Sequence, residues 1–449
     1  MKKPTINLPK EVESILYTLN ELGYEAYIVG GCVRDSLMGN IPNDWDITSS
    51  ARPDEIKKVF SKTYDTGLEH GTVTVRIKNE YHEVTTYRTE GLYKDHRRPS
   101  EVEFVSDINL DLGRRDFTSN AIAYHPKEGY IDPYNGMEDI KKAILRSVRN
   151  PVERFTEDAL RILRGVRFSA QLGFSIEEET LDGMIECKDL LNHISKERIR
   201  DEMIKILLSD SPDKLIDMHK WGLLEYVIPE LTSCFNTPQN HPHHIYDVGT
   251  HTIKAIKETP KDLILRLTML LHDIGKPATH TRDRDGIDHF YGHVDKSVDM
   301  TRKILRRLRF DNKTISQVSA LVKYHDIHIE EELTRVKIKK ILNQIGPDLF
   351  SKLLIVQEAD ARAQNPDKLG PKLDNLKETR EIFTDIIKNK ECYSLDELEI
   401  NGKNLKDMGI NEGREIGASL QYALELVIKN PNLNRKEILE EKIKEYRLK

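Results

Sequence analysis

Cysteines are scarce in this chain of 449 residues, and no two of them are spaced as a metal-binding or redox pair. The four lie far apart, at Cys32, Cys187, Cys234 and Cys392. Disulfide frameworks and zinc sites use closely patterned cysteines, so dispersed thiols favour a protein of a reducing compartment. The sequence therefore predicts reduced thiols and a cytoplasmic location.

Long apolar runs and an excess of basic charge are also absent. No stretch approaches the roughly 20 apolar residues of a membrane-spanning helix, and the first residues predict an amphipathic helix instead of a secretory signal. We therefore expect no membrane association. With 69 Lys and Arg against 75 Asp and Glu, the net charge is −6, so any nucleic-acid-binding surface must be a local patch.

Two adjacent glycines followed by alternating carboxylates are the most informative feature that is present. Gly30 and Gly31 can bring bare backbone N–H groups against a triphosphate. Asp44 and Asp46, one residue apart on an extended segment, would project to the same side, where two carboxylates suit Mg²⁺. Each feature alone is typical of an ordinary turn or a solvated strand. Their conjunction favours nucleotidyl transfer.

These residues carry a resemblance to a known family. Residues 30–35, Gly-Gly-Cys-Val-Arg-Asp, followed by Asp-Trp-Asp at 44–46, resemble the head of the class II tRNA nucleotidyltransferases, the bacterial CCA-adding enzymes and their poly(A) polymerase relatives. Three further segments resemble family motifs in the same order: 114–121, 132–136 and 157–168. The resemblance implies a polymerase β-type nucleotidyltransferase that uses CTP, ATP and tRNA, with no protein partner implied.

The family's site residues can be assigned only where the motifs match. The resemblance implies a Mg²⁺ site of three catalytic carboxylates, Asp44, Asp46 and Glu83. Glu83 lies on a predicted hairpin strand, where its alternative role is to pair with a basic side chain of the neighbouring strand. The head residues implied to contact the nucleotide are Gly30, Gly31, Arg34 and Arg115.

A helix predicted from Arg154 to Phe168 places Asp158 and Arg161 three residues apart on one face. For an isolated pair, a solvated ion pair would be the ordinary interpretation. The resemblance implies base selection instead, because a carboxylate only accepts and a guanidinium only donates hydrogen bonds, which suits cytosine and adenine and opposes uracil and guanine. Arg164 and Arg167 would face the triphosphate or hold this pair.

A polar segment over residues 87–99 lies between the first two motifs and lacks helical periodicity. An ordinary connecting loop would have the same composition. In the resembling family this element lets the pocket change from CTP to ATP, and enzymes that add only CC have it truncated. The intact segment therefore favours complete CCA addition. Poly(A) polymerization and partial addition remain alternatives.

A second constellation of histidines and aspartates begins near residue 240. Its order, His, then His-Asp, then Asp, resembles the HD superfamily of metal-dependent phosphohydrolases, and the matching ligands are His251, His272, Asp273 and Asp326. Imidazoles mixed with carboxylates suit a divalent transition metal, or Mg²⁺ bound more weakly. His293 and His325 could serve a second metal. The alternative is a helical body for tRNA without catalysis.

The predicted fold class is α+β. A polymerase β-type nucleotidyltransferase head over residues 1–140 would precede an all-α neck over 141–235 that selects the nucleotide. The strand signal fades after about residue 140. An HD domain would follow over 236–345, and a helical body and tail over 346–449 would bind tRNA.

Overall fold

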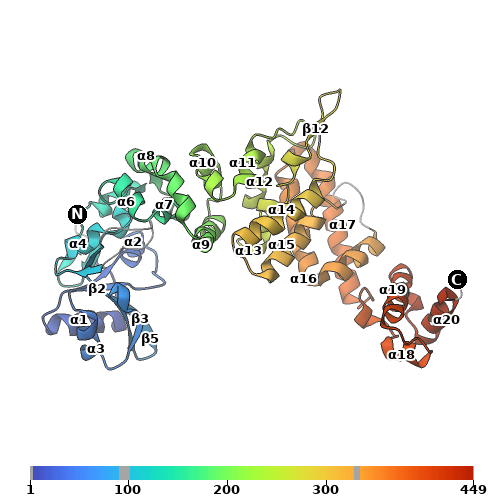
Figure 1. Cartoon of the computed structure of the whole chain (residues 1–449), viewed down its shortest axis with the longest axis horizontal. Coiled ribbons are helices and arrows are strands. Elements are labelled where there is room, and N and C mark those ends of the chain that lie inside the picture. The colour runs from blue at the N-terminus through green and yellow to red at the C-terminus, as the bar shows by residue number, and fades with distance from the viewer. Residues whose placement is uncertain (1–3, 91–101, 328–333, 448–449) are drawn as a thin grey trace. The chain divides into compact units, whose positions relative to one another are not determined.

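The computed structural model describes residues 4–90, 102–327 and 334–447 (Figure 1). The chain divides into two compact units, Met1–Pro229 and Glu230–Lys449. Within the described ranges, no helix is both long and apolar enough to cross a membrane. The predicted domain boundaries at residues 140, 235 and 345 stay predictions.

A seven-stranded mixed sheet forms the first part of the first unit, in the order β3-β4-β5-β2-β1-β8-β9. Its strands are β1 (Ala26–Val29), β2 (Ile47–Ser49), β3 (Thr63–Gly67), β4 (Thr72–Ile77), β5 (Glu80–Thr86), β8 (Ala123–His125) and β9 (Gly129–Ile131). Only β2 and β5 run parallel among these neighbours. A separate two-stranded sheet consists of β6 (Arg88–Glu90) and β7 (Val102–Phe104), which lie between β5 and β8 in the sequence.

One face of this sheet is covered by α1 (Lys10–Glu21), whose buried residues are Val12, Ile15, Leu16 and Leu19. This spacing places all four on one side of a helix. They share a core with Ile28, Ile47 and Val84 from the three central strands. The other short helices of the sheet region are α2 (Gly31–Leu37), α3 (Pro53–Val59), α4 (Ile108–Gly113) and α5 (Gly136–Lys142).

The rest of the first unit is helical apart from the short parallel pair β10 (Ile144–Leu145) and β11 (Ser175–Ile176). Its helices are α6 (Pro151–Glu157), α7 (Leu160–Leu172), α8 (Glu178–Glu186), α9 (Lys196–Leu207) and α10 (Lys214–Lys220), followed at the division by α11 (Pro229–Phe235). The predicted α+β class, a sheet-containing head followed by a helical body, is confirmed.

The single helix predicted from Arg154 to Phe168 is wrong. The chain leaves the helical conformation at Asp158, where φ is −135° and ψ is 100°, and the Asp158 carboxylate accepts a hydrogen bond from the backbone N–H of Leu160 at 3.1 Å. Aspartate favours such local bonds over a helix interior. Asp158 and Arg161 therefore do not share the face of one continuous helix.

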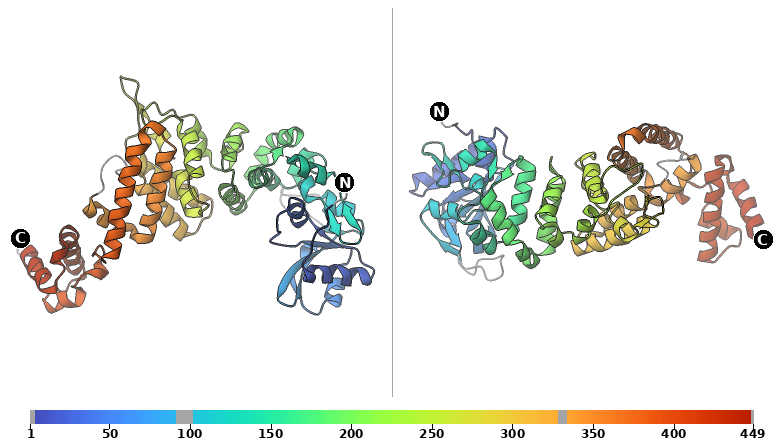
Figure 2. Two further views of the ribbon diagram at one scale, coloured as in Figure 1. Left: turned by 180° about the vertical axis from the view of Figure 1, so that it is seen from behind. Right: turned by 90° about the horizontal axis from the view of Figure 1, so that it is seen from above.

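The second unit is built of helices with one short hairpin, β12 (Thr281–Arg282) and β13 (Asp288–His289). Its helices are α12 (Val248–Lys257), α13 (Leu263–Leu271), α14 (His293–Arg307), α15 (Asn312–Tyr324), α16 (Arg335–Arg362), α17 (Leu369–Lys388), α18 (Gly402–Asp407), α19 (Gly413–Lys429) and α20 (Lys436–Arg447). The long helices α16 and α17 lie side by side (Figure 2).

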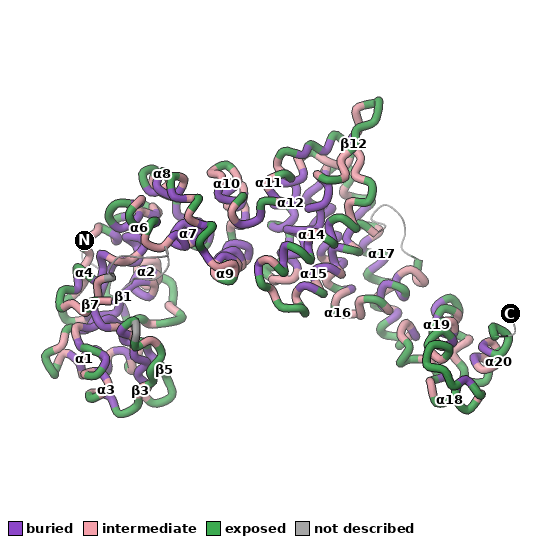
Figure 3. Tube along the Cα trace, viewed as in Figure 1, coloured by how far each residue is buried: buried purple, intermediate pink, exposed green. Residues whose placement is uncertain are grey.

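Two hydrophobic clusters hold the second unit together. The first joins α15, α16 and α17 around the buried ring of Phe350, and the second joins α18, α19 and α20. Most residues of α12 and α13 are also buried, and Figure 3 shows this part of the second unit largely in purple. Helix α16 is interrupted at Gly346, which adopts φ 75° and ψ 168° before Pro347. The interruption redirects the chain between the parts of α16.

Candidate functional site

Arginines converge on a cavity of about 620 Å³ in the first unit. They come from the head and from α7 and α9, and are Arg34, Arg88, Arg114, Arg115, Arg161, Arg164, Arg167 and Arg198. The same cavity is lined by Gly30, Gly31, Asp46 and Asp158. Guanidinium groups match phosphate oxygens in charge and geometry, so this cavity suits a polyphosphate. All of the predicted nucleotide-contacting residues line it.

Gly30 allows two charged side chains to approach the turn between β1 and α2. Its φ of 81° and ψ of −130° are accessible to glycine and strained for other residues. A Cβ atom at this position would lie 2.9 Å from Nη1 of Arg115 and 3.9 Å from Oδ2 of Asp46. The glycine thus brings the backbone, a guanidinium and a carboxylate to one point.

Three carboxylates, those of Asp44, Asp46 and Glu83, line a second cavity of about 790 Å³. Asp44 and Asp46 lie in the loop that leads into β2, and all three residues are exposed. The parallel register pairs Ile47 with Val84, so the preceding residues, Asp46 and Glu83, are neighbours on the face opposite the core. Asp46 lines both cavities.

The electrostatics of Asp46 fit a cation site. Loss of solvation against the cavity walls raises the pKa of Asp46; Arg115 opposes this shift, and the negative charge of Asp44 adds to it. Like-charged carboxylates side by side disfavour ionization unless a cation lies between them. Carboxylate oxygens are the donors that Mg²⁺ takes, but the oxygens of these three residues do not all lie within 4.8 Å of one another in the described structure.

Buried carboxylates hold the arginines of the cavity in place. Asp116 contacts Arg164 at 2.5 Å, and Glu202 contacts Arg167 at 3.0 Å. Burial alone would raise the pKa of Asp116, but Arg164 and a hydrogen bond from Asn120 outweigh it and hold this pKa well below its usual range. Asp116 is therefore ionized and fixes the Arg164 guanidinium at the cavity wall.

A second buried carboxylate supports the next two arginines. Asp111 is fully buried, and it contacts Arg114 at 2.9 Å and Arg115 at 3.4 Å. Desolvation acts to raise the pKa of Asp111, but the two guanidinium groups lower it overall. Arg34 is held differently, by a 2.6 Å hydrogen bond to the side-chain oxygen of Asn120.

The two predicted base-selecting residues both reach the cavity, and each is held by another charge. Nη2 of Arg198 on α9 donates to Oδ2 of Asp158 at 2.9 Å. Nη1 of Arg161 donates to Oε2 of Glu157 at 2.9 Å, and Nη2 donates to the backbone carbonyl of Arg114 at 3.0 Å. These contacts fix one acceptor and one donor at separate points of the wall.

Several supporting residues were not predicted from the sequence. Asp116 and Glu157 lie inside the quoted motifs, where a carboxylate beside arginines was a usable signal. Arg198 lies 40 residues beyond Asp158, and no local pattern connects the two. The predicted nucleotide-dependent loop falls partly on residues 91–101, which lie outside the described residues, so its role stays a prediction.

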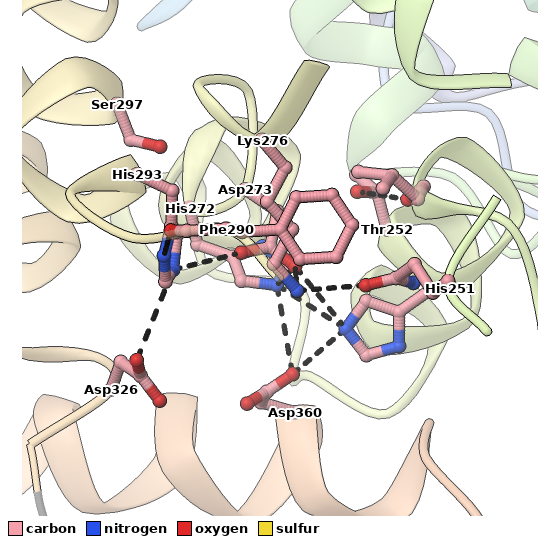
Figure 4. A network of polar contacts seen from close by, with 12 residues as sticks. His251, Thr252, His272, Asp273, Lys276, Phe290, His293, Ser297, Asp326 and Asp360 are labelled. Carbon is pink, nitrogen blue, oxygen red and sulfur yellow. Dashed lines mark hydrogen bonds and ion pairs between the residues drawn. The ribbon is translucent and has the colours of Figure 1, made fainter. Parts of the chain in front are cut away.

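A buried cluster of histidines and aspartates occupies the second unit (Figure 4). His251 on α12, His272 at the end of α13 and Asp360 on α16 form a first triad. Nε2 of His251 lies 2.8 Å from Oδ1 of Asp360 and 3.4 Å from Nε2 of His272. All three residues are buried.

A second triad consists of Asp273, His293 and His325. Oδ1 of Asp273 lies 3.6 Å from Nε2 of both histidines, while its Oδ2 lies 3.2 Å from Nε2 of His272 in the first triad. Asp273 therefore connects the triads. Its Oδ1 is buried and has no hydrogen-bond partner in the described part of the chain.

The orientation of the imidazoles fits metal binding. Nδ1 of His272, His293 and His325 lies 2.7 Å, 2.9 Å and 2.7 Å from the backbone carbonyls of Met269, Phe290 and Val322, respectively. A carbonyl only accepts, so each Nδ1 carries the proton in the neutral ring and each Nε2 lone pair points into the cluster. Such backbone support is typical of metal-ligating histidines.

The predicted ligand Asp326 is not in the cluster, and we correct that assignment. Its side chain lines the same cavity as Asp273 and His293, but it is 56% exposed and lies 3.9 Å from Nε2 of His293, outside both triads. Asp360, which is 4% exposed, supplies the buried carboxylate instead. The other predicted ligands, His251, His272 and Asp273, are brought together.

Comparisons with known proteins agree with this architecture. Family models match residues 26–146, as the poly A polymerase head domain, residues 173–235, as an RNA and SrmB-binding site of polymerase A, and residues 289–443, as tRNA nucleotidyltransferase domain 2. The crystal structure of the Bacillus stearothermophilus CCA-adding enzyme in complex with CTP is 28% identical, with a TM-score of 0.74 and 98% of each chain covered.

Curated relatives match over part of their length. The chain is 48% identical to the CCA-adding enzyme of Ligilactobacillus salivarius over 228 residues, 50% of this chain and 55% of that protein. It is 50% identical to the Enterococcus faecalis enzyme over 209 residues, 46% of this chain and 52% of that protein. The chain thus spans about half the length of these curated relatives. Over the matched ranges it is similar to CCA-adding enzymes and to the poly A polymerase head domain.

The Asp116–Arg164 pair predicts a pH-dependent stability difference. Arg164→Ala should destabilize the first unit at pH 7 by about 2 kcal/mol, below the cost of a fully buried broken pair because Arg164 is partly exposed. The folded-state pKa of Asp116 is depressed, so the lost contribution is present above the unfolded pKa of about 4 and fades in acid. Urea unfolding of the wild type and the Arg164→Ala variant at a series of pH values measures the difference in their free energies of unfolding. A difference that does not shrink below about pH 4 would contradict the assignment.

Proposed function

We propose that the protein adds CMP, CMP and AMP to the 3′ end of tRNA from CTP and ATP, without a nucleic-acid template, and releases pyrophosphate. The observation that carries this proposal is the position of Asp46, which lines both the arginine-rich cavity and the cavity of Asp44 and Glu83. A nucleotide in the first cavity would present its α-phosphate to the carboxylates. A primer end in the second would reach the same point.

The reaction is an in-line displacement at phosphorus. The oxygen of the tRNA 3′-hydroxyl attacks the α-phosphorus, the bond to the bridging oxygen breaks, and pyrophosphate leaves with its electron pair. Asp44, Asp46 and Glu83 would hold Mg²⁺, which lowers the pKa of the hydroxyl and neutralizes charge on the leaving group. Arg34 and Arg115 would bind the triphosphate near Gly30, while Arg164 and Arg167 complete its basic surroundings.

Base selection would rest on Asp158 and Arg161. Cytosine and adenine present an amine donor beside an unprotonated ring nitrogen, whereas uracil and guanine present a carbonyl beside a ring N–H. An acceptor at Asp158 and a donor at Arg161 match the first pattern and oppose the second. Glu157 and Arg198 position the two side chains through the contacts described above.

Poly(A) polymerization and partial addition use the same chemistry and remain alternatives. Incubating the protein with tRNA that lacks CCA, with CTP and ATP, and resolving the products to single nucleotides distinguishes them. Three added residues ending in adenosine support the proposal. Two cytidines, one adenosine or a long adenosine tail would each replace it. Such an enzyme would work in the cytoplasm, which stays a prediction.

The second unit supports a separate candidate function as a metal-dependent phosphohydrolase. The observation that favours it is the pair of buried triads connected by Asp273, with Nε2 lone pairs turned inward. His251, His272 and Asp360 would hold one divalent transition metal and His293 and His325 a second, with Asp273 between them. When bound, such metals activate water and polarize a phosphate ester. Lys276, 2.7 Å from Asp273, would balance the negative charge of the site.

Loss of a carboxylate should separate catalysis from tRNA binding. Asp46→Ala should slow CMP and AMP addition by roughly 10³-fold or more, because the transition-state charge loses its metal ligand. The Kd for tRNA should change little, because affinity comes mainly from phosphate contacts. Single-turnover addition and filter binding measure the two quantities. A proportionate loss of tRNA affinity would refute the catalytic assignment.

Loss of either base-selecting side chain, or of the arginine that supports Asp158, should lower fidelity. We expect Asp158→Ala, Arg161→Ala and, more weakly, Arg198→Ala to lose discrimination against UTP by about 5- to 150-fold, the equivalent of about 1–3 kcal/mol. Arg200→Ala is the matched control, since Arg200 on α9 pairs with Asp201 and does not line the cavity. Competition between CTP and UTP measures the ratio. Variants that are slow but equally selective would exclude base selection by this pair.

The corrected ligand set gives a direct comparison between two aspartates. Asp360→Ala should reduce the transition metal retained by the purified protein by at least roughly tenfold, because it removes a buried ligand. Asp326→Ala should retain the metal. Elemental analysis after dialysis measures this, and hydrolysis of a simple phosphodiester should follow metal content. Equal metal loss in both variants, or in neither, would contradict the assignment.

A further inference from the structure

A cavity of about 350 Å³ lies among α14, α15 and α16 in the second unit. Helices α14 and α15 pack side by side (Figure 1), and residues of both line the cavity together with residues of α16. Its lining shares no residue with the histidine and aspartate triads. Cavities that bind ligands begin at roughly 300 Å³, so this one has room for a phosphodiester group with part of its sugar.

Three positive charges converge on this cavity. Arg302 and Arg306 line it from α14, and Lys323 lines it from α15. A spacing of four residues places the two arginines on one helical face. No carboxylate among the described residues forms an ion pair with any of the three, whereas the adjacent Arg307 pairs with Glu230 at 2.5 Å. The three cations therefore leave a local excess of positive charge that an anion would neutralize.

A buried hydroxyl adds an independent sign of a ligand. Ser319 lines the same cavity from α15 and is 4% exposed. Its Oγ has no hydrogen-bond partner among the described residues. Buried polar side-chain atoms nearly always have a partner. A ligand oxygen beside the cations would accept a hydrogen bond from this hydroxyl.

The chemistry of the cavity selects phosphate over a base. Arginine forks, an ammonium and a hydroxyl all donate hydrogen bonds, as phosphate oxygens require. The only aromatic ring in its lining is Tyr324, and the ammonium of Lys323 lies over this ring at 5.4 Å from its centroid. Base stacking needs an open ring. These residues would therefore bind the charged backbone of a nucleic acid without distinguishing its bases.

We propose that this cavity, the Arg302–Arg306–Lys323 pocket, binds a phosphate of an RNA backbone. The proposed function identifies that RNA as tRNA, and the inference rests on it for this identity alone. The pocket would be a local basic patch of the kind that an acidic chain needs in order to bind nucleic acid. Its contribution would be to affinity and positioning, independent of the bases of the tRNA.

Salt dependence of tRNA binding tests the proposal on the full chain. The Kd for tRNA lacking CCA is measured by fluorescence anisotropy over a series of KCl concentrations. Arg302→Ala with Arg306→Ala should weaken binding most at low salt and reduce the slope of log Kd against log salt by about one, because the pocket neutralizes one phosphate. Arg306→Lys should keep the slope and lose some affinity, because lysine cannot bind in a bidentate manner.

Arg284→Ala is the control for overall charge. Arg284 is an exposed arginine of the same unit, between β12 and β13 and outside the pocket. Its loss should leave the slope unchanged. If Arg306→Ala and Arg284→Ala alter Kd and slope equally, the pocket has no specific role and the proposal is overturned. If wild-type protein neither binds tRNA nor adds nucleotides to it, the proposed function fails instead.

Ser319→Ala tests the buried hydroxyl separately. It should weaken tRNA binding without changing the salt slope or the melting temperature, since the hydroxyl has no protein partner to lose. A lower melting temperature with unchanged tRNA binding would assign Ser319 to packing and contradict the proposal. Inorganic phosphate is the second probe. If it stabilizes the wild type but not the double arginine variant, while both bind tRNA equally, the pocket serves free phosphate and the RNA assignment is wrong.

Discussion

The pairing of buried carboxylates with arginines is the interaction on which the first unit's site depends. Eight arginines line this cavity. Without counter-charges their guanidinium groups would repel one another, because charges removed from water interact strongly. Asp111, Asp116 and Glu202, all at most 7% exposed, each anchor one or more of them. Asp111 and Glu202 do not line the cavity, whereas Asp116 does, and all eight guanidinium-bearing side chains line it. The site is thus preorganized for an anion before any anion arrives.

Closeness in the sequence determined which residues of this site could be predicted. Gly30, Gly31, Asp44 and Asp46 were identified because the turn and the carboxylates lie close together in sequence. The break between α6 and α7 was missed because residues 154–168 have a helical pattern throughout. The structure shows it in the extended backbone angles of Asp158 and in the local bond from Leu160 to Asp158. Hydrophobic periodicity indicates the secondary structure of a segment as a whole. It does not report one residue at which a side chain competes with the backbone.

The second site shows a different limit. His272 and Asp273 were identified as neighbours in the chain, but the buried carboxylate beside them comes from Asp360, 109 residues after its partner His251. Asp326 was assigned because it supplies the last aspartate of the His, His-Asp, Asp order. It lines the same cavity as Asp273 and His293, but its side chain is 56% exposed. The buried carboxylate comes from another helix, α16, which the sequence pattern did not include.

The two proposed metal sites offer a cation different sets of ligands. The head offers exposed carboxylate oxygens at the meeting point of two cavities, a donor set that suits a hard ion shared with substrate phosphates. The second unit buries imidazoles whose protons are fixed by backbone carbonyls, a donor set that favours transition metals over Mg²⁺. Because softness and burial both differ, an ion suited to one site is poorly suited to the other. If both proposed sites bind metal, each would select its ion by its own ligands.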